Sequence, residues 1–507
     1  MKSHLLFKSR RGNRYVFDKK KKRTGLCHPI LYYLLSLDDR GKKLEQWFEG
    51  LNGSSVTVQG VGPVTNKDIE YYLKKYLLLK KNGHFETCDQ ERRLSNRLTP
   101  VNVKEFLANV RQVTFETTEK CNLSCEYCGY GKFYNYKDIR QNITMDISTA
   151  KTILTYLQGS WNSALNRSHD QNIYISAYGG EPMLNFEFIR ELVQFVKELE
   201  LLHNRVTFSM TTNGLLLEKH MDFLVENDFN LLISLDGGES NNGYRVFKDG
   251  KPAYRTILEN VKSLKVKYSG YFARRVNFNA VIHKKNSVAE VFNYFKRQFG
   301  KIPSVSALNT FGVREDQKET FWKTYLNIND GLYNSEDYSL IEKEMFINLP
   351  DIQQLSTFLH INSDCCFNNY NELLYSLDEK PRFPTGTCQP FSKKIFITAG
   401  GKIYPCERID HRYVLGNADK NGVHIDFEEI ARKYNRWYDK VVKQCEGCYN
   451  AEECAQCIFS LDLAAGDVSC KGFMNRQEYA RRLSSHIDSI ETNPLIYPKI
   501  LKKVLIS

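Results

Sequence analysis

The stretch Gln112-Val-Thr-Phe-Glu-Thr-Thr-Glu-Lys-Cys-Asn-Leu-Ser-Cys-Glu-Tyr-Cys128 decides how the rest of this chain is interpreted. Its first seven residues, 112–118, alternate between apolar and polar side chains, as in a β-strand. Three cysteines, Cys121, Cys125 and Cys128, follow directly after this strand. Ligands of α/β proteins bind at the carboxyl ends of parallel strands. The stretch therefore predicts a thiol-lined ligand site in the loop after a strand.

Three thiolates in one loop could hold three irons of a four-iron cluster and leave the fourth iron open, because such clusters are bound by cysteine thiolates. A structural zinc site would need a fourth Cys or His ligand. No further Cys or His lies within ten residues of the triplet. Zinc binding and ordinary buried or free cysteines remain the two alternatives for this loop.

Strand patterns alternate with helix patterns between residues 105 and 340, with helices expected at 186–203 and 254–268. This alternation implies a parallel sheet. The strands are expected at 112–118, 172–178, 206–212, 231–236, 275–282 and 304–309.

A second motif, Gly179-Gly180-Glu181-Pro182, stands at the end of the next strand, 51 residues after Cys128. Glycine lets a ligand approach the backbone closely. The CxxxCxxC triplet and this turn together resemble the radical S-adenosylmethionine (radical SAM) superfamily. The resemblance implies an α/β fold with a partial (β/α)6 barrel, and a [4Fe-4S] cluster that binds SAM through its open iron.

The resemblance also implies which residues contact SAM. The Gly179–Glu181 segment would hold the amino group, Ser234 the ribose and Arg255 the carboxylate. Tyr127 would cover the adenine side, and Asp236 could bind ribose hydroxyls. For Ser234, Asp236 and Arg255, an ordinary polar residue without a ligand role is the alternative. The predicted cofactor-binding residues are thus Tyr127, Gly179, Gly180, Glu181, Ser234, Asp236 and Arg255.

Seven further cysteines lie between residues 386 and 475, and their order resembles the SPASM extension of radical SAM enzymes. One spacing departs from that pattern, because two residues rather than three separate Cys454 from Cys457. Structural zinc is the alternative, since CxxC pairs also bind zinc. The resemblance implies two auxiliary [4Fe-4S] clusters, the first on Cys388, Cys406 and Cys457, the second on Cys445, Cys448, Cys454 and Cys470.

The first auxiliary cluster lacks a fourth ligand in this assignment. Some relatives carry a cysteine at the position of Arg382, so either Cys365 or Cys366 supplies the ligand, or the site is open to substrate. Glu407 directly follows Cys406, where sulfatase-maturing relatives have a carboxylate that takes a proton from the substrate. Glu407 is therefore the candidate catalytic base, with a surface acid as the alternative.

Residues 1–104 have mixed patterns: a hairpin over 5–17, a helix over 29–37, a strand over 56–59 and a helix over 67–81. This order could build a winged-helix-like α+β module. In radical SAM peptide-modifying enzymes such modules often bind a leader peptide as an added strand; a structural cap is the alternative. The remaining expected boundaries are 105–340 for the core, 341–385 for a connecting segment, 386–475 for the SPASM domain and 476–507 for a C-terminal tail.

Composition restricts the class of protein. The chain has 507 residues, 42% hydrophobic and 26% charged, and its 14 cysteines are too few for a disulfide scaffold. The start of the chain does not resemble a secretory signal, and the longest apolar run, 29–37, is too short to span a bilayer. A cytoplasmic protein is expected. The net charge of +12 comes largely from residues 8–23, which hold nine basic side chains and could bind RNA or an acidic peptide, or form a solvated surface.

These observations predict a radical SAM oxidoreductase that reductively cleaves SAM to a 5′-deoxyadenosyl radical. The radical would abstract hydrogen from a ribosomally made precursor peptide, with a cross-link, thioether or similar product. A low-potential donor such as flavodoxin or ferredoxin would supply the electron, and neither a membrane nor a nucleic acid is an expected partner. The alternatives are an anaerobic sulfatase-maturing (formylglycine-generating) enzyme and an RNA-modifying or RNA-binding iron–sulfur protein.

Overall fold

Six parallel strands make up most of the large sheet, and each lies within two residues of its predicted position. Their spatial order follows the chain, as expected when each strand–helix unit crosses over to the neighbouring position. The prediction of an α/β protein with a parallel sheet is confirmed. The strands are β6 (Gln112–Thr118), β7 (Asn172–Gly179), β8 (Arg205–Thr212), β9 (Asn230–Ser234), β10 (Val276–Ile282) and β11 (Ser304–Ala307).

The structure is a computed structural model. It describes residues 4–87, 90–135, 137, 139–328, 332, 337–345, 349–362, 382–385, 388–461, 463 and 468–504.

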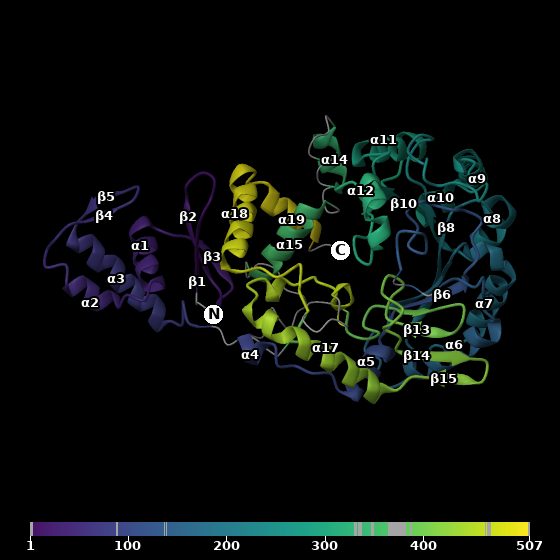
Figure 1. Cartoon of the computed structure of the whole chain (residues 1–507), viewed down its shortest axis with the longest axis horizontal. Helices are drawn as coiled ribbons and strands as arrows, with labels where there is room; N and C mark the ends of the chain where they lie inside the picture. Colours follow the sequence, from purple (N-terminus) through teal and green to yellow (C-terminus); the bar gives the residue numbers. More distant parts are fainter. Residues whose placement is uncertain are drawn as a thin grey trace.

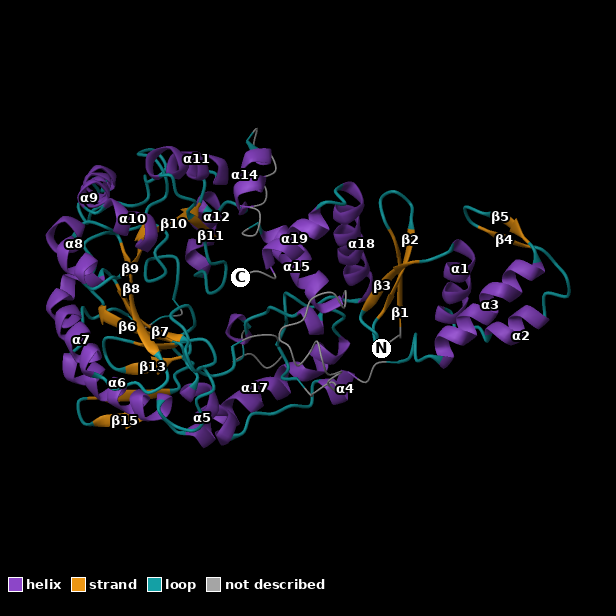
Figure 2. Cartoon of the chain, turned by 180° about the vertical axis from the view of Figure 1, so that it is seen from behind, coloured by secondary structure: helices purple, strands orange, loops and turns teal. Residues whose placement is uncertain are grey.

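Helices cover the outer face of the parallel sheet (Figure 2). Each carries apolar residues at helical spacing toward the strands; α7, for example, buries Phe188, Leu192 and Val196. Full burial of each such side chain contributes about 1.5–3 kcal/mol. These helices are α6 (Ile147–Trp161), α7 (Phe186–Glu198), α8 (Leu217–Glu226), α9 (Tyr254–Lys267), α10 (Ser269–Arg275) and α11 (Val288–Phe299), with a 3-10 turn, η1 (Pro182–Asn185), ahead of α7.

Four further strands extend the same sheet beyond β6, which the sequence did not predict. β12 pairs in parallel with β6, so that Ile395 lies opposite Val113. All three residues of β12 are buried. Pairing protects the edge of β6, which would otherwise expose unpaired backbone groups. The expected boundary at residue 386 therefore does not separate two sheets. The added strands are β12 (Ile395–Ile397), β13 (Lys402–Tyr404), β14 (Gly416–Asp419) and β15 (Gly422–His424).

The N-terminal residues form a separate small module at one end of the molecule (Figure 1). The predicted hairpin is present, with Leu5 opposite Phe17. The predicted second helix begins at Thr65, whose hydroxyl caps the backbone N–H of Asp68. The module contains β1 (His4–Lys8), β2 (Arg14–Asp18), β3 (Arg23–Leu26), α1 (Pro29–Asp39), α2 (Leu44–Glu49), β4 (Val56–Val58), β5 (Gly62–Val64) and α3 (Asn66–Lys81).

The C-terminal helices connect this module to the rest of the chain. α18 packs against β1, and α15, α18 and α19 lie between the module and the parallel sheet (Figure 1). No helix among the described residues has the length and apolar character needed to cross a bilayer. The remaining elements are α4 (Gln90–Arg93), α5 (Pro100–Ala108), η2 (Glu315–Gln317), α12 (Lys318–Thr324), α14 (Tyr338–Met345), α15 (Pro350–Asn362), α17 (Phe427–Gly447), η4 (Ala451–Glu453), η5 (Ile458–Ser460), α18 (Arg476–Thr492) and α19 (Ile496–Val504).

Candidate active site

The three cysteines of the first motif lie in the loop that follows β6, as predicted. Two of their sulfurs face hydrogen-bond donors: the Leu123 N–H donates to Cys121 Sγ at 3.5 Å, and Arg245 Nη1 lies 3.9 Å from Cys125 Sγ. Hydrogen bonds to sulfur tune the iron–sulfur clusters that thiolates hold. We call residues 119–129 the cluster loop.

The cluster loop is fixed along its outer side by the segment that follows β9. The Ser124 N–H donates to the Val246 carbonyl at 2.8 Å, and the Glu126 N–H donates to the Tyr244 carbonyl at 3.0 Å. These two bonds place the cysteines without the use of side chains. The loop position therefore depends on the backbone of residues 244–246.

The two glycines of Gly179-Gly180 are required by the protein backbone itself. A Cβ on Gly180 would meet the Lys120 carbonyl oxygen at 2.2 Å, and one on Gly179 would meet the Thr118 carbonyl oxygen at 2.3 Å. Gly179 also has a φ of +138°, which side chains disfavour. The expectation that these glycines make room for a ligand is thus incomplete, because they first make room for the start of the cluster loop.

Glu181 is fully buried and its carboxylate is occupied by protein donors. Its Oε1 accepts from the Thr212 hydroxyl at 2.8 Å and from the Met183 N–H at 3.2 Å, while Oε2 accepts from the Asn213 N–H at 2.8 Å. Burial raises the pKa of Glu181 to about 7, although these bonds act in the opposite direction. The side chain connects the ends of β7 and β8.

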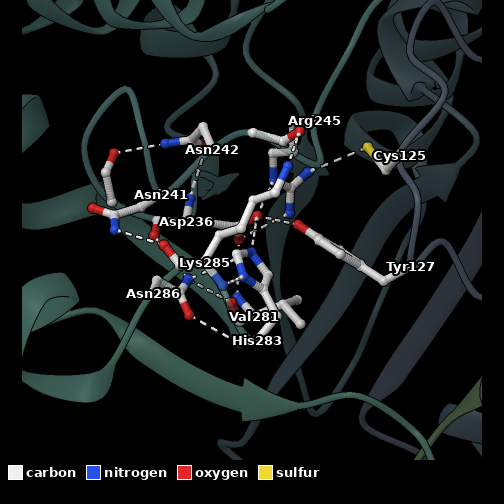
Figure 3. A network of polar contacts seen from close by, with 12 residues as sticks. Cys125, Tyr127, Asp236, Asn241, Asn242, Arg245, Val281, His283, Lys285 and Asn286 are labelled. Atoms are coloured by element: carbon white, nitrogen blue, oxygen red, sulfur yellow. Dashed lines mark hydrogen bonds and ion pairs between the residues drawn. The ribbon is translucent and has the colours of Figure 1, made fainter. Parts of the chain in front are cut away.

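Asp236 is the centre of a buried polar network (Figure 3). Arg245 Nε donates to its Oδ2 at 3.0 Å, the Tyr127 hydroxyl donates to the same oxygen, and the Val281 N–H donates to Oδ1 at 2.9 Å. His283 Nε2 lies 3.7 Å away. Burial acts to raise the pKa of Asp236, but the Arg245 guanidinium lowers it and the net direction is down. Asp236 is therefore ionised.

Arg245 is the residue that sequence reasoning missed. It is 8% exposed and connects Asp236 to Cys125. Arg255, which was expected near the ligand, has an 80% exposed side chain that pairs with Glu239 on the surface. The expected role of Arg255 is therefore not supported by its position. Arg255 was predicted from the position of a basic residue in related proteins. Arg245 stands ten residues earlier, in an irregular segment.

Ser234 ends β9 and is half-buried. Among the described residues its hydroxyl has no hydrogen-bond partner, so it could contact a ligand. Tyr127, at 9% exposure, is inaccessible at its hydroxyl because this donates to Asp236, while its ring borders a cavity.

That cavity, of about 560 Å³, lies between the cluster loop and the second group of cysteines. Tyr127 and Gly129 line it from the loop, and Cys388, Cys406 and Cys457 line it from the other side. Its size lies in the range of ligand pockets. The cavity brings together the cluster loop and a cysteine group that lies more than 250 residues later in the chain.

Contacts among the seven C-terminal cysteines fall into two sets. Cys388 Sγ lies 3.7 Å from Cys457 Sγ, and the Cys388 thiol, burial and Cys406 together raise the pKa of Cys457. In the second set, burial raises the pKa of Cys445, and the nearby thiols of Cys454, Cys448 and Cys470 raise it further.

Glu407 lines the cavity beside Cys406, as expected for a candidate base. Its carboxylate pairs with Lys394 Nζ at 3.0 Å. Burial acts to raise the pKa of Glu407, but Lys394 and then Arg408 among other groups lower it below its usual range. Lys137 also borders the cavity and donates to the Glu407 carbonyl at 2.9 Å, and burial lowers the pKa of Lys137 to about 8.

The thiols of the three groups are available as ligands of iron–sulfur clusters. None of the eleven described cysteines forms a disulfide bond, and ten of them make up the three groups above. Among the described residues, no three His, Cys, Asp or Glu side chains converge as tightly as the ligands of a single metal ion. Cys365 and Cys366, suggested as fourth ligands, lie outside the described residues, and Arg382 donates to the Glu452 carbonyl.

The basic run at 8–23 is partly used inside the protein. Lys19 is buried with its ammonium 4.8 Å from the centre of the Tyr449 ring, and Lys22 Nζ lies 3.3 Å from Glu452. These contacts attach the N-terminal hairpin to the cysteine-rich C-terminal region. They favour an internal docking role over the RNA-binding alternative for this part of the run.

Comparison with known proteins agrees with this geometry. Residues 115–296 match the Radical SAM superfamily. The chain is similar to a cysteine-type anaerobic sulfatase-maturating enzyme of Clostridium novyi, with 28% identity over 306 residues that cover 57% of this chain and 71% of that protein. It is also similar to the radical SAM cyclopropyl synthase TigE of Paramaledivibacter caminithermalis, with 21% identity over 266 residues, 52% of either chain.

Among solved structures, the protein is similar to native anSMEcpe with bound AdoMet and Kp18Cys peptide. The TM-score is 0.51 at 17% identity, over 78% of this chain and 99% of that one. At this identity the likeness concerns the fold. The cysteine loop at the end of β6, the parallel sheet and the sequence match agree, and residues 115–296 of this chain are therefore a radical SAM domain of the radical SAM superfamily.

Proposed function

We propose that this protein is a radical SAM enzyme that modifies a ribosomally made precursor peptide by hydrogen-atom abstraction, with a cross-link, thioether or similar product. The observation that carries the proposal is the 560 Å³ cavity, lined by Tyr127 and Gly129 on one side and by Cys388, Cys406 and Cys457 on the other. A substrate in this cavity would contact the cluster loop and the Cys388/Cys406/Cys457 group at once.

The cluster loop would hold the [4Fe-4S] cluster through Cys121, Cys125 and Cys128. The donors that face the sulfurs of Cys121 and Cys125, and the backbone bonds that anchor the loop, fit that role. When bound, the cluster and SAM supply a carbon-centred radical that removes a hydrogen atom from the substrate. Ser234 would contact the ribose through its available hydroxyl. The buried Asp236 network would hold Tyr127 in place beside the cavity.

The C-terminal cysteines would hold two auxiliary clusters in the sets 388/406/457 and 445/448/454/470. The proximity of Cys388 to Cys457, and of Cys445 to its three neighbours, supports this division. Glu407 would take a proton from the substrate. Its low pKa, maintained by Lys394, keeps it in the proton-accepting form at neutral pH.

A peptide substrate is supported by the N-terminal module. β3 pairs with β2 along one edge, and no described strand pairs with its other edge. An extended leader peptide could add to that edge through backbone hydrogen bonds. The comparisons add that TigE is a cyclopropyl synthase and that anSMEcpe was solved with a peptide.

One alternative has its own support. A sulfatase-maturing activity would fit Glu407 beside Cys406 and the similarity to the Clostridium novyi enzyme. The two functions differ in substrate, so a peptide that contains the target cysteine of a sulfatase distinguishes them. Conversion of that cysteine to formylglycine would favour the alternative.

The first experiment measures iron and SAM cleavage in anaerobically reconstituted protein, with a Cys121/Cys125/Cys128→Ala variant beside the wild type. About twelve irons that fall to about eight, with loss of 5′-deoxyadenosine, would support three four-iron clusters. Zinc in place of iron, or no SAM cleavage by the wild type with any reductant, would refute the enzyme proposal.

The second experiment identifies the substrate. The enzyme is co-expressed with short reading frames that flank its gene, and the peptides are analysed by mass spectrometry for loss of hydrogen. Glu407→Gln should retain iron and 5′-deoxyadenosine formation while the peptide product falls about 100-fold or more. The matched control is Glu428→Gln, an exposed glutamate in the first turn of α17.

A further inference from the structure

The cluster loop has a second accessible side, away from the substrate cavity. Cys121 and Asn122 line an open depression of about 760 Å³, together with Leu184 and Phe247. None of its lining residues also lines the 560 Å³ cavity. The loop therefore separates two spaces, one with the second cysteine group and one open to solvent.

Of the three loop cysteines, only Cys121 lines this depression. Cys125 is directed instead toward the buried Arg245. Electron transfer slows steeply with distance, so an external donor delivers electrons fastest where a cluster ligand comes nearest the surface. Because Cys121 borders the open depression, a donor seated there would lie against a cluster ligand.

The rim of the depression is basic. Lys120 and Lys248 border it, and neither ammonium makes a hydrogen bond or ion pair with another described residue. The one acid on the rim, Asp249, pairs with Lys251 at 3.0 Å. A tight turn holds Lys248 outward, because the Phe247 N–H donates to the Lys251 carbonyl at 2.8 Å.

The centre of the same face is apolar. Leu184 is 42% exposed, and Phe247 is half-buried beside Cys121. Transient electron-transfer complexes have small interfaces, with little buried area. A small apolar centre with a cationic rim matches an acidic, weakly bound partner, because complementary charge raises the association rate.

We propose that this depression is the docking site of an acidic, low-potential one-electron carrier of the flavodoxin type, which reduces the cluster through the Cys121 side. This inference rests on the proposed radical SAM activity. One electron passes from the flavodoxin hydroquinone, which becomes the semiquinone, to the cluster; no bond in this chain forms or breaks. Substrate and electrons thus reach the cluster loop from opposite sides.

The test compares two double variants with the same change in charge. Lys248→Glu/Lys251→Glu alters the rim of the depression, where Lys251 pairs with Asp249, whereas Lys219→Glu/Lys262→Glu alters exposed positions on α8 and α9. Each replaces two positive charges by two negative ones. 5′-Deoxyadenosine formation is measured with a bacterial flavodoxin, kept reduced by its NADPH-dependent reductase, and separately with dithionite.

The depression variant should be reduced about tenfold more slowly by flavodoxin at low ionic strength, with an unchanged dithionite rate. Added salt should lower the rate at which flavodoxin reduces the wild-type protein, because exposed charges are screened. It should also narrow the difference in this rate between the wild type and the depression variant. Equal flavodoxin rates for the two double variants would overturn the proposal. No cleavage with dithionite in the wild type would instead refute the underlying activity.

A second readout does not depend on turnover. Carbodiimide joins lysine amines directly to carboxylates of a bound partner, and peptide mapping then locates the joined lysines. Cross-links from flavodoxin to Lys120 or Lys248 would support the docking site. Cross-links confined to other lysines of the wild-type protein would overturn it.

Discussion

Arg245 Nη1 lies 3.9 Å from Cys125 Sγ, while Nε of the same guanidinium lies 3.0 Å from the Asp236 carboxylate. One buried cation thus contacts both a cysteine of the cluster loop and an acid at the end of β9. The Tyr127 hydroxyl binds the same carboxylate. The sheet end and the cluster loop are therefore held in register by a charge pair rather than by apolar packing alone.

Arg245→Gln is expected to lower the midpoint potential of the cluster on the loop. The reduced cluster is more negative than the oxidised one, so loss of a neighbouring cation and of a hydrogen bond to sulfur disfavours reduction. Redox titration monitored by EPR, with SAM added to identify this cluster's signal, measures the shift. Arg245→Lys should shift the midpoint potential less, because lysine keeps the positive charge although it lacks the planar guanidinium group.

Arg255→Gln is the control for this prediction, since its side chain is exposed on α9. Removal of Arg245 also leaves Asp236 buried without its cation, at a cost of about 3–5 kcal/mol. Iron retained by the auxiliary clusters and an unchanged circular dichroism spectrum show whether the variant is folded. An unchanged potential in folded Arg245→Gln protein would contradict the role assigned to Arg245.

Gly180→Ala is expected to remove the loop cluster and leave the auxiliary ones. The new Cβ would meet the Lys120 carbonyl at 2.2 Å, and backbone cannot yield as a flexible side chain can. Iron content should fall from about twelve to about eight per chain. Gly159→Ala is the matched control: nothing lies within 4 Å of its added Cβ in α6, and alanine favours a helix by about 1 kcal/mol. Full iron content in Gly180→Ala would show that the loop can move aside.

The sequence was sufficient to predict the parallel strands, and it identified the cysteines that the structure places in the loop after β6 and beside the cavity. Both are local or regular signals: apolar alternation predicted β6, and short Cys spacings predicted ligands such as Cys121 and Cys125. Arg245 carried no such signal, because its two partners are set by tertiary structure and it lies 120 residues from Cys125. Spacing alone favoured Arg255, which lies on the exposed face of α9.

The extension of the sheet could not be predicted for a related reason. β12 is only three residues long, and its partner β6 lies about 280 residues earlier in the chain. The apolar residues of a short strand such as Ile395–Ile397 indicate that the strand is buried. They do not indicate which other strand it pairs with. Glycine roles were only partly predicted, since Gly180 was expected beside a ligand and the structure places the Lys120 carbonyl there.

Glu181 should make stability depend on pH in an unusual direction. Its native pKa of about 7 exceeds the ordinary value of 4.5, so the native state holds its proton more tightly than the unfolded chain. The contribution of Glu181 to the free energy of unfolding is therefore fully present below pH 4.5. About 3 kcal/mol of stability is lost as the pH rises through 7. Unfolding of Glu181→Gln compared with the wild type from pH 4.5 to 7.5 measures it.

The free energy of unfolding of Glu181→Gln should therefore rise relative to the wild type as the pH increases. Glu187→Gln, an exposed residue of α7, should show a constant difference from the wild type over the same range. A constant difference for Glu181→Gln as well would mean that Glu181 is ionised throughout, with its three hydrogen bonds prevailing over burial.

Glu452→Gln is expected to loosen the N-terminal hairpin from the C-terminal region. Glu452 accepts from Arg93 and lies 3.3 Å from Lys22, so its neutralisation weakens two charge contacts between distant parts of the chain. These groups are only partly exposed, and a loss of about 1 kcal/mol corresponds to roughly fivefold faster local opening. Hydrogen exchange should accelerate over residues 14–26 and stay unchanged over β6, with Glu428→Gln as the exposed control. If residues 14–26 exchange at the wild-type rate, the contacts of β1 with α18 suffice to hold the hairpin in place without the charge contacts of Glu452.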